Sequence, residues 1–245
     1  MSTPPTLWRD LRRFTPARVA LGRAGNGLPT GAHLAFQAAH AAARDAVHAE
    51  LNADQLAADL AAAGLPSTVV HSACPDRRTY LLRPDLGRRL AEGEAAKLAP
   101  SPGIAFVVAD GLSATAAQRH AAPLLAQVLA TLGQTGPVVI ARQGRVALGD
   151  EIGAALGAEA VAVLIGERPG LSTPDSLGVY LTWQPRPGRT DAERNCISNI
   201  RPEGLPIPEA AAKLLWLINA MRQLRLTGVA LKDEQPAAVG RIGEV

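Results

Sequence analysis

The chain has 245 residues, of which 47% are hydrophobic, 19% charged and only 3% aromatic, with a formal net charge of +3. This size and composition are typical of one large globular domain, or of a domain with an appendage, and they exclude a disordered chain. A weak positive charge with so few aromatic side chains to stack on bases argues against a nucleic-acid-binding protein.

The cysteine positions and the hydropathy exclude further classes of protein. The two cysteines, Cys74 and Cys196, lie far apart in the sequence, which excludes a disulfide framework and a zinc site of the CxxC type. The start at Met1 has no secretory signal pattern, and no apolar run has the length that a membrane span needs. We therefore expect a soluble, cytoplasmic protein that contacts no membrane.

Residues 1–100 are predicted to form a mostly helical N-terminal region. A short tail over 1–6 precedes an arginine-rich segment, residues 7–25, which fits an anion site, a partner-docking arm or a solvated face. Thr30 is the expected N-cap of a helix to about residue 47. Asn52 or Asp54 then begins a helix that ends near Gly64, followed by a short strand over 67–71.

A proline-rich boundary near residue 100 divides the chain into regions 1–100 and 101–245. Just before it, residues 80–90 are expected to form a turn that enters a helix. After it, the pattern alternates between strands (104–109, 137–141, 160–165 and 177–183) and helices (115–133 and 149–157). This alternation predicts an α/β fold with a Rossmann-like, mainly parallel sheet flanked by helices.

The C-terminal part completes this prediction. Residues 194–199 are expected to form a loop, and the last helix to begin at Pro208. One face of that helix repeats apolar side chains at helical spacing, which predicts a core-facing side: Leu214, Leu217, Ile218, Met221 and Leu224. The tail from residue 233 is expected to be loose.

Polar turns follow the predicted strands at residues 110–113, 142–146 and 166–170, with segment 194–199 after the next strand. In a parallel sheet these would meet along one edge, where ligands bind. They carry no histidine and no glycine-rich nucleotide fingerprint, so we expect them to bind a large polar ligand rather than to catalyse a reaction unaided.

Two residues on this edge have alternative interpretations. Glu167 lies between Gly166 and Gly170, which fits either a ligand loop or an ordinary strand exit with a solvated ion pair to Arg168. Cys196 fits either a ligand contact or a small buried hydrophobic side chain.

Several stretches of the chain match, in order and spacing, the small subunit of ethanolamine ammonia-lyase, an adenosylcobalamin-dependent enzyme. The chain resembles this family from about residue 7 to about residue 228. The matching stretches are Thr15-Pro-Ala-Arg-Val, Gly22-Arg-Ala-Gly, Tyr80-Leu-Leu-Arg-Pro-Asp-Leu-Gly-Arg-Arg-Leu, Asp110-Gly-Leu-Ser, Gly144-Arg-Val, Leu164-Ile-Gly-Glu-Arg-Pro-Gly-Leu and Cys196-Ile-Ser-Asn-Ile.

The resemblance implies that this chain binds adenosylcobalamin between itself and a catalytic large subunit, a TIM barrel, in a hetero-oligomer of large–small pairs. The complex would convert ethanolamine to acetaldehyde and ammonia by a radical mechanism. The family's cofactor contacts correspond to Val146, Glu167 and Cys196 in this chain. No catalytic residue and no metal ligand are expected in this chain. The resemblance implies that the cofactor's own dimethylbenzimidazole base stays on cobalt, so no histidine ligand is required.

Enteric members of the family carry a long N-terminal extension associated with packaging in a bacterial microcompartment. This sequence has no such extension. We therefore expect a cytoplasmic location, with the microcompartment as the alternative.

Two other functions remain as alternatives from the residues alone. The strand–helix alternation fits a stand-alone enzyme that uses a nucleotide, although the glycine fingerprint of such enzymes is missing. The arginine-rich segment 7–25 fits a nucleic-acid-binding module, for which salt-sensitive DNA binding would be required.

Overall fold

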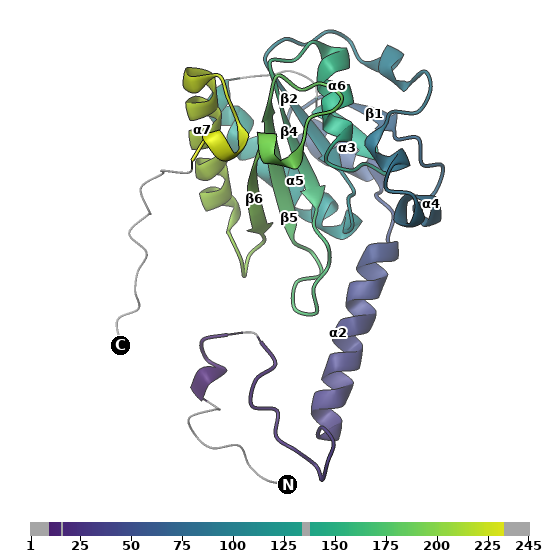
Figure 1. Ribbon diagram of the computed structural model, residues 1–245, viewed down its shortest axis with the longest axis vertical. Helices are drawn as coiled ribbons and strands as arrows, with labels where there is room; N and C mark the ends of the chain where they lie inside the picture. Colours follow the sequence, from purple (N-terminus) through teal and green to yellow (C-terminus); the bar gives the residue numbers. More distant parts are fainter. Residues whose placement is uncertain (1–9, 16, 134–137, 233–245) are drawn as a thin grey trace.

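The computed structural model describes residues 10–15, 17–133 and 138–232. Within these ranges the chain forms a six-stranded sheet with helices on both faces, and a long N-terminal helix, α2, extends away from this body (Figure 1). The predicted tails over 1–6 and from residue 233 lie outside the described residues, as does Pro137, the first residue of one predicted strand.

The elements follow one another along the chain largely as predicted. The helices are α2 (Thr30–His48), α3 (Ala53–Ala62), α4 (Arg77–Leu82), α5 (Ala114–Leu132), α6 (Leu148–Leu156) and α7 (Ile207–Leu224). The strands are β1 (Ser67–His71), β2 (Ile104–Ala109), β3 (Val138–Arg142), β4 (Ala160–Gly166), β5 (Leu177–Trp183) and β6 (Arg194–Ile200). Short 3₁₀ turns lie at Leu86–Arg88, Glu94–Lys97, Asp191–Glu193 and Gly228–Ala230.

The sheet is mixed, so the expected Rossmann-like parallel sheet is only partly correct. The strand order is β1-β3-β2-β4-β5-β6. The first four strands pair in parallel, but β5 is antiparallel to β4, and β6 is antiparallel to β5. A parallel crossover needs about a dozen residues or more, usually with a helix. The segment between Gly166 and Leu177 is shorter and has no helix, so the chain turns back.

The segment 194–199, predicted as a loop, is instead the edge strand β6. Its sequence is mostly polar, because only Ile197 and Ile200 turn toward the core, while Cys196 and Ser198 are exposed. Ile197 and Ile200 lie three residues apart, because the pairing with β5 shifts register between Leu177 and Val179, so the strand shows no period-two apolar alternation in sequence. The missing alternation explains the wrong prediction.

Alternating side chains of the strands divide the core into two layers. Ala160, Ala162 and Leu164 of β4 pack in the larger layer with α3, α5 and α7, and Val161 and Val163 pack in the smaller layer with α6. This period-two alternation places a buried strand between two apolar layers. Helix α6 packs mainly against β2 and β4, and it reaches β6 through the side-chain pair of Asp150 and Arg194, so the part of this face around Tyr180 and Cys196 is left more open.

Helix ends agree with the sequence in some places and differ in others. The Asn52 side chain caps α3 by accepting a hydrogen bond from the Gln55 N–H at 3.0 Å, as predicted. Thr30 is not an N-cap: Pro29 occupies that position and Thr30 is already helical. On α7, Leu224 is 59% exposed, unlike the four other apolar residues of its predicted face.

The prediction of a turn entering a helix over residues 80–90 was partly correct: a turn at residues 84–85 enters the 3₁₀ helix Leu86–Arg88, but helix α4 precedes the turn. Helix α4 ends at Leu82, before the turn at Pro84, because proline disfavours helical backbone in the residue before it. Asp76 caps this helix by accepting from the Thr79 N–H at 2.7 Å. The region before residue 100 also supplies β1, which pairs with β3 at one edge of the sheet.

Candidate functional site

The three turns after β2, β3 and β4 meet at the carboxyl ends of the parallel strands, as the sequence predicts. Asp110, after β2, is 1% exposed, and its carboxylate accepts the backbone N–H groups of Gln143 and Gly144, each at 2.9 Å. These bonds hold the turn after β3 against the turn after β2. Burial raises the pKa of Asp110, while nearby Arg77 and the two N–H groups act in the opposite direction.

Glycine is required where the turns after β2 and β4 touch. Gly111 has φ +55°, and a Cβ atom on it would lie 2.2 Å from the Gly166 carbonyl oxygen. A Cβ on Gly166 would in turn lie 1.9 Å from the carbonyl oxygen of Ser113. Any side chain at either position would force the two turns apart. The close approach fixes where the chain emerges from β4 toward Glu167.

Tyr80 of α4 supports the turn that carries Val146. Its ring lies between two guanidinium groups, with Arg77 Cζ 4.7 Å and Arg145 Cζ 4.2 Å from the ring centroid. The Tyr80 hydroxyl donates to the Gly144 carbonyl at 3.2 Å, and burial raises the pKa of this phenol. The backbone N–H of Arg145 donates to the Gly87 carbonyl at 2.8 Å. Residues 77–87 therefore hold the backbone on the N-terminal side of Val146.

Glu167 is fixed by its own strand end and by its neighbours. Its Oε2 accepts from the Ser176 hydroxyl and, at 3.2 Å, from the Asn199 N–H at the end of β6. Gly178 leaves room for the carboxylate, since a Cβ there would lie 3.0 Å from Glu167 Oε1. Oε1 has no hydrogen-bond partner among the described residues. The carboxylate is thus held from one side with an acceptor oxygen still available.

Cys196 lies on the more open part of the sheet face that carries α6. It pairs across the strands with Tyr180 of β5, and its Sγ lies 3.2 Å from the Ser198 hydroxyl oxygen. The thiol is exposed, which rules out the interpretation of Cys196 as a buried hydrophobic side chain. Burial, and next the adjacent Cys196, raise the pKa of the Tyr180 phenol.

A hollow of about 470 Å³, here called the Glu167 hollow, lies over these turns. It brings Val146 and Glu167 together. Cys196 does not line it, but Tyr180, the strand partner of Cys196, does. The lining residues are Tyr80, Gly111, Leu112, Arg145, Val146, Ile165, Gly166, Glu167, Arg168 and Tyr180.

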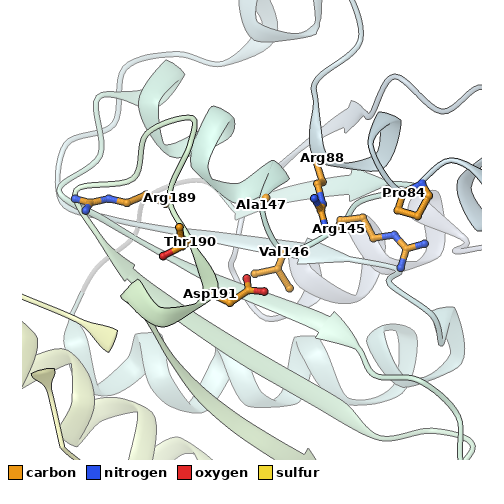
Figure 2. Close-up of a pocket in the computed structure, with 8 residues that line it drawn as sticks. All are labelled: Pro84, Arg88, Arg145, Val146, Ala147, Arg189, Thr190 and Asp191. Atoms are coloured by element: carbon orange, nitrogen blue, oxygen red, sulfur yellow. The ribbon is translucent and has the colours of Figure 1, made fainter. Parts of the chain in front are cut away.

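A second hollow of about 440 Å³, here called the arginine hollow, adjoins the first (Figure 2). Arg145 and Val146 line both hollows, so the two form neighbouring compartments on either side of one turn. Ala147, next to Val146 in the same turn, also lines it, and the remaining residues come from the turn after α4 and from the segment before β6: Pro84, Arg88, Arg189, Thr190 and Asp191.

The sequence did not point to several residues of this region. Tyr180 was assigned only to a strand, and residues 189–191 were not singled out. A signal existed for Tyr180: it is one of two tyrosines in the chain, and it occupies the strand face opposite Val179 and Leu181. Residues 189–191 precede an unrecognised strand, so no pattern in the sequence placed them beside Val146.

The chain is therefore an α/β protein with two adjoining hollows at the carboxyl ends of its parallel strands. Together these hollows form a surface site of a size that fits a ligand. The family model described as "Ethanolamine ammonia-lyase light chain (EutC)" matches residues 5–232. The chain therefore belongs to the ethanolamine ammonia-lyase light chain family, as the resemblance predicted.

Curated relatives agree with this assignment along nearly the whole chain. A protein of Azotobacter vinelandii named ethanolamine ammonia-lyase small subunit is 56% identical, over 94% of this chain and 90% of the relative. Proteins of the same name from Xanthomonas campestris pv. campestris and Bradyrhizobium diazoefficiens are 54% and 55% identical, over 96% and 98% of this chain and 92% and 95% of the relatives. In the part of the chain that the structure describes, no helix is both long and apolar enough to cross a membrane.

Proposed function

We propose that this chain is the small subunit of an ethanolamine ammonia-lyase and binds adenosylcobalamin where it meets a large subunit. In this proposal Val146, Glu167 and Cys196 contact the cofactor, and hetero-oligomers of large–small pairs convert ethanolamine to acetaldehyde and ammonia. The observation that carries the proposal is that Val146 and Glu167, far apart in sequence, line one hollow in a chain of this family.

The residues of the Glu167 hollow fit a corrin ring. The ring bears peripheral amides whose N–H groups need acceptors, and Glu167 Oε1 is an acceptor with no donor among the described residues. Val146, Leu112 and Ile165 supply the apolar surface that a broad, partly apolar ring requires. Tyr180 and Cys196 extend this surface along the more open part of the sheet face that carries α6.

The cofactor supplies radical chemistry when bound, and the task of this chain is to bind and orient it and to keep water away. Glu167 holds an amide group, and its carboxylate is kept in position by Ser176 and Asn199. Val146 presents an apolar side chain from a turn whose backbone is fixed by Asp110 and Tyr80. This arrangement provides one side of a binding site, and the large subunit provides the other.

The N-terminal region, residues 1–100, packs on the large subunit in this proposal. Support comes from apolar side chains on and beside the extended helix α2: Leu28 is 51% exposed, Leu34 57% and Phe36 40%. Exposed apolar groups gathered on one element are typical of an interaction surface. The proposed surface also accounts for a long helix that has only one buried residue of its own, Ala46.

The test uses the complex reconstituted from this chain and its large subunit. Adenosylcobalamin is titrated into the wild-type complex and into a Glu167→Ala, Cys196→Ala double variant, and both affinity and ethanolamine turnover are measured. We expect the double variant to bind about tenfold or more weakly, the loss typical of one charge-assisted hydrogen bond with its packing.

Glu209→Ala is the matched control, because Glu209 is an exposed carboxylate of α7 that lines neither hollow and lies outside residues 1–100. It should leave the affinity unchanged. Equal affinities in the double variant and the wild type would contradict the site assignment. A wild-type complex that neither binds the cofactor nor acts on ethanolamine would contradict the proposed function itself.

A further inference from the structure

A pocket of about 400 Å³, here called the α2 pocket, lies between helix α2 and the loop that joins β4 to β5. One wall is the last turns of α2, from His40 to His48, and the other is the loop segment 168–171. Figure 1 shows this loop running beside α2, the helix that extends away from the body of the molecule. The α2 pocket therefore brings together two segments that lie far apart in the chain.

Basic side chains line the α2 pocket, and among the described residues no carboxylate lines it. His40, Arg44 and His48 follow one another at intervals of four residues, which places them along one side of the helix. Arg168 adds a second guanidinium group from the opposite wall. The pocket therefore has a net positive charge and fits an anionic group.

The chain itself supplies little negative charge to balance these groups. Arg44 lies 4.0 Å from Asp45, but the two side chains are 68% and 76% exposed, so this pair contributes little. Arg168 is exposed, and its side chain has no hydrogen-bond or ion-pair partner in the part of the chain that the structure describes. Two guanidinium groups on facing walls repel each other, and an anion between them would relieve that repulsion.

The α2 pocket also has apolar walls. Val47 and Leu171 line it beside the two arginines. Arg18, from the arginine-rich N-terminal segment, donates to the Leu171 carbonyl at 3.4 Å and lies 6.0 Å from the ring centroid of Phe36 in α2, so it connects the two walls. Arginine beside apolar and aromatic side chains is typical of a protein–protein interface. A free anion, in contrast, would use the charges alone.

We infer that the α2 pocket receives an acidic segment of the large subunit, whose carboxylates pair with Arg44 and Arg168. Guanidinium groups form planar, charge-assisted hydrogen bonds with carboxylates. The exposed side chains of Leu34 and Phe36 lie on the same helix, so the pocket continues the surface by which residues 1–100 are proposed to pack on the large subunit. The inference rests on the proposed function and deepens it, because it states the chemistry by which the two subunits recognise each other.

Arg44 is the better probe of the two arginines. Arg168 also lines the Glu167 hollow, so replacing it would disturb the proposed cofactor site as well. Arg44 lines neither the Glu167 hollow nor the arginine hollow, and alanine favours helix at least as much as arginine does, so Arg44→Ala should leave α2 folded. Arg186→Ala is the matched control, because Arg186 is exposed, lies in the loop after β5 and lines none of these three sites.

The experiment measures the dissociation constant of the complex between this chain and its large subunit, without adenosylcobalamin, at low and at high salt. We expect Arg44→Ala to weaken the complex about tenfold at low salt, as for one charge-assisted hydrogen bond, and Arg44→Glu to weaken it further. The difference from the wild type should shrink at about 1 M salt, because screening weakens charge pairs. Arg44→Lys should keep part of the affinity, and Arg186→Ala all of it.

Three outcomes would overturn the inference while the proposed function stands. An Arg44→Ala complex as tight as the wild type at low salt would show that the arginine makes no contact with the large subunit. A loss of equal size at low and high salt would assign the effect to packing of the side chain rather than to its charge. A short DNA duplex that binds the wild-type chain but not Arg44→Ala would assign the pocket to a nucleic acid.

A different result would remove the proposed function. A wild-type chain that forms no complex with the large subunit at either salt concentration would contradict the assignment of this chain as its partner, and the inference would fall with it.

Discussion

The two faces of the sheet are built differently. One face is covered by α3, α5 and α7, and its layer consists of apolar side chains such as Leu164 and Leu214. On the other face α6 packs mainly on the parallel strands β2 and β4, and the antiparallel strands carry Arg194, Tyr180 and Cys196. The hollows lie on this second face, at the edge of the helical cover. The comparison shows that the candidate site occurs where apolar packing gives way to polar contacts.

On the second face of the sheet, a buried ion pair rather than apolar packing joins helix α6 to strand β6. Arg194 of β6 contacts both carboxylate oxygens of Asp150 of α6, at 2.8 and 2.6 Å, and both side chains are at most 2% exposed. We expect Asp150→Ala to lower the free energy of unfolding by about 3–5 kcal/mol, because it removes the buried carboxylate that balances the charge of a buried guanidinium. Urea unfolding followed by circular dichroism measures the change.

Two further variants sharpen this prediction. Asp191→Ala removes an exposed carboxylate near the same arginine and should change the free energy of unfolding by no more than about 0.5 kcal/mol. Replacing both partners, as in Asp150→Leu with Arg194→Met, should recover much of the loss. A small effect of Asp150→Ala would mean that the second face does not depend on polar contacts.

On the face covered by α3, α5 and α7, substitutions that create a cavity should have the largest effect on the free energy of unfolding. Leu214 of α7 is fully buried, so Leu214→Ala should lower the free energy of unfolding by about 2–5 kcal/mol. Leu224→Ala, on the same helix but at a position 59% exposed, should change it by less than about 0.5 kcal/mol. Urea unfolding of both variants measures the two changes in the free energy of unfolding. Similar losses in both variants would show that α7 also buries its C-terminal end, for example against another chain.

The smallest effect is expected at the rim of the arginine hollow, where a carboxylate holds a turn. The backbone N–H of Thr190, followed by Arg189, lowers the pKa of Glu193 from 4.5 to about 2. Because the folded-state pKa is lowered, the stabilisation is complete above about pH 4.5 and is lost as the pH falls through about 2. Wild type should therefore be more stable than Glu193→Gln at pH 7.

Unfolding of the two proteins at several pH values measures this difference. It should shrink steadily below pH 4.5 and vanish near pH 2. A difference that stays constant over this range would assign the effect to packing of the side chain rather than to its charge.

The parts of the fold with a strong local pattern could be predicted from the sequence. The apolar runs of β2 and β4 and the spacing in α5 gave strands and a helix close to their observed bounds. The placement of Val146 and Glu167 at one edge of the sheet, after two strands that are consecutive in the chain, also followed, since parallel strands end at one edge. In contrast β6, whose core-facing residues Ile197 and Ile200 lie three apart because of a register shift, has no period-two apolar pattern, and its prediction as a loop was wrong.

Contacts between distant segments were not predictable from the residues alone. The Arg194–Asp150 pair and the Tyr80 ring between Arg77 and Arg145 join residues that no periodicity relates. The direction of β5 was also missed, since alternation of strands and helices does not show that one connection lacks a crossover helix.

By itself, the sequence determined the family, the order of most helices and strands, and the edge at which polar turns gather, because these depend on local patterns and matched stretches. Only the tertiary structure decided that two strands run antiparallel and that one face stays partly open. It also decided that Arg88 and Arg145 share a hollow with Val146. These features depend on how segments far apart in the chain pack, and packing is set by shape and charge in three dimensions rather than by spacing along the chain.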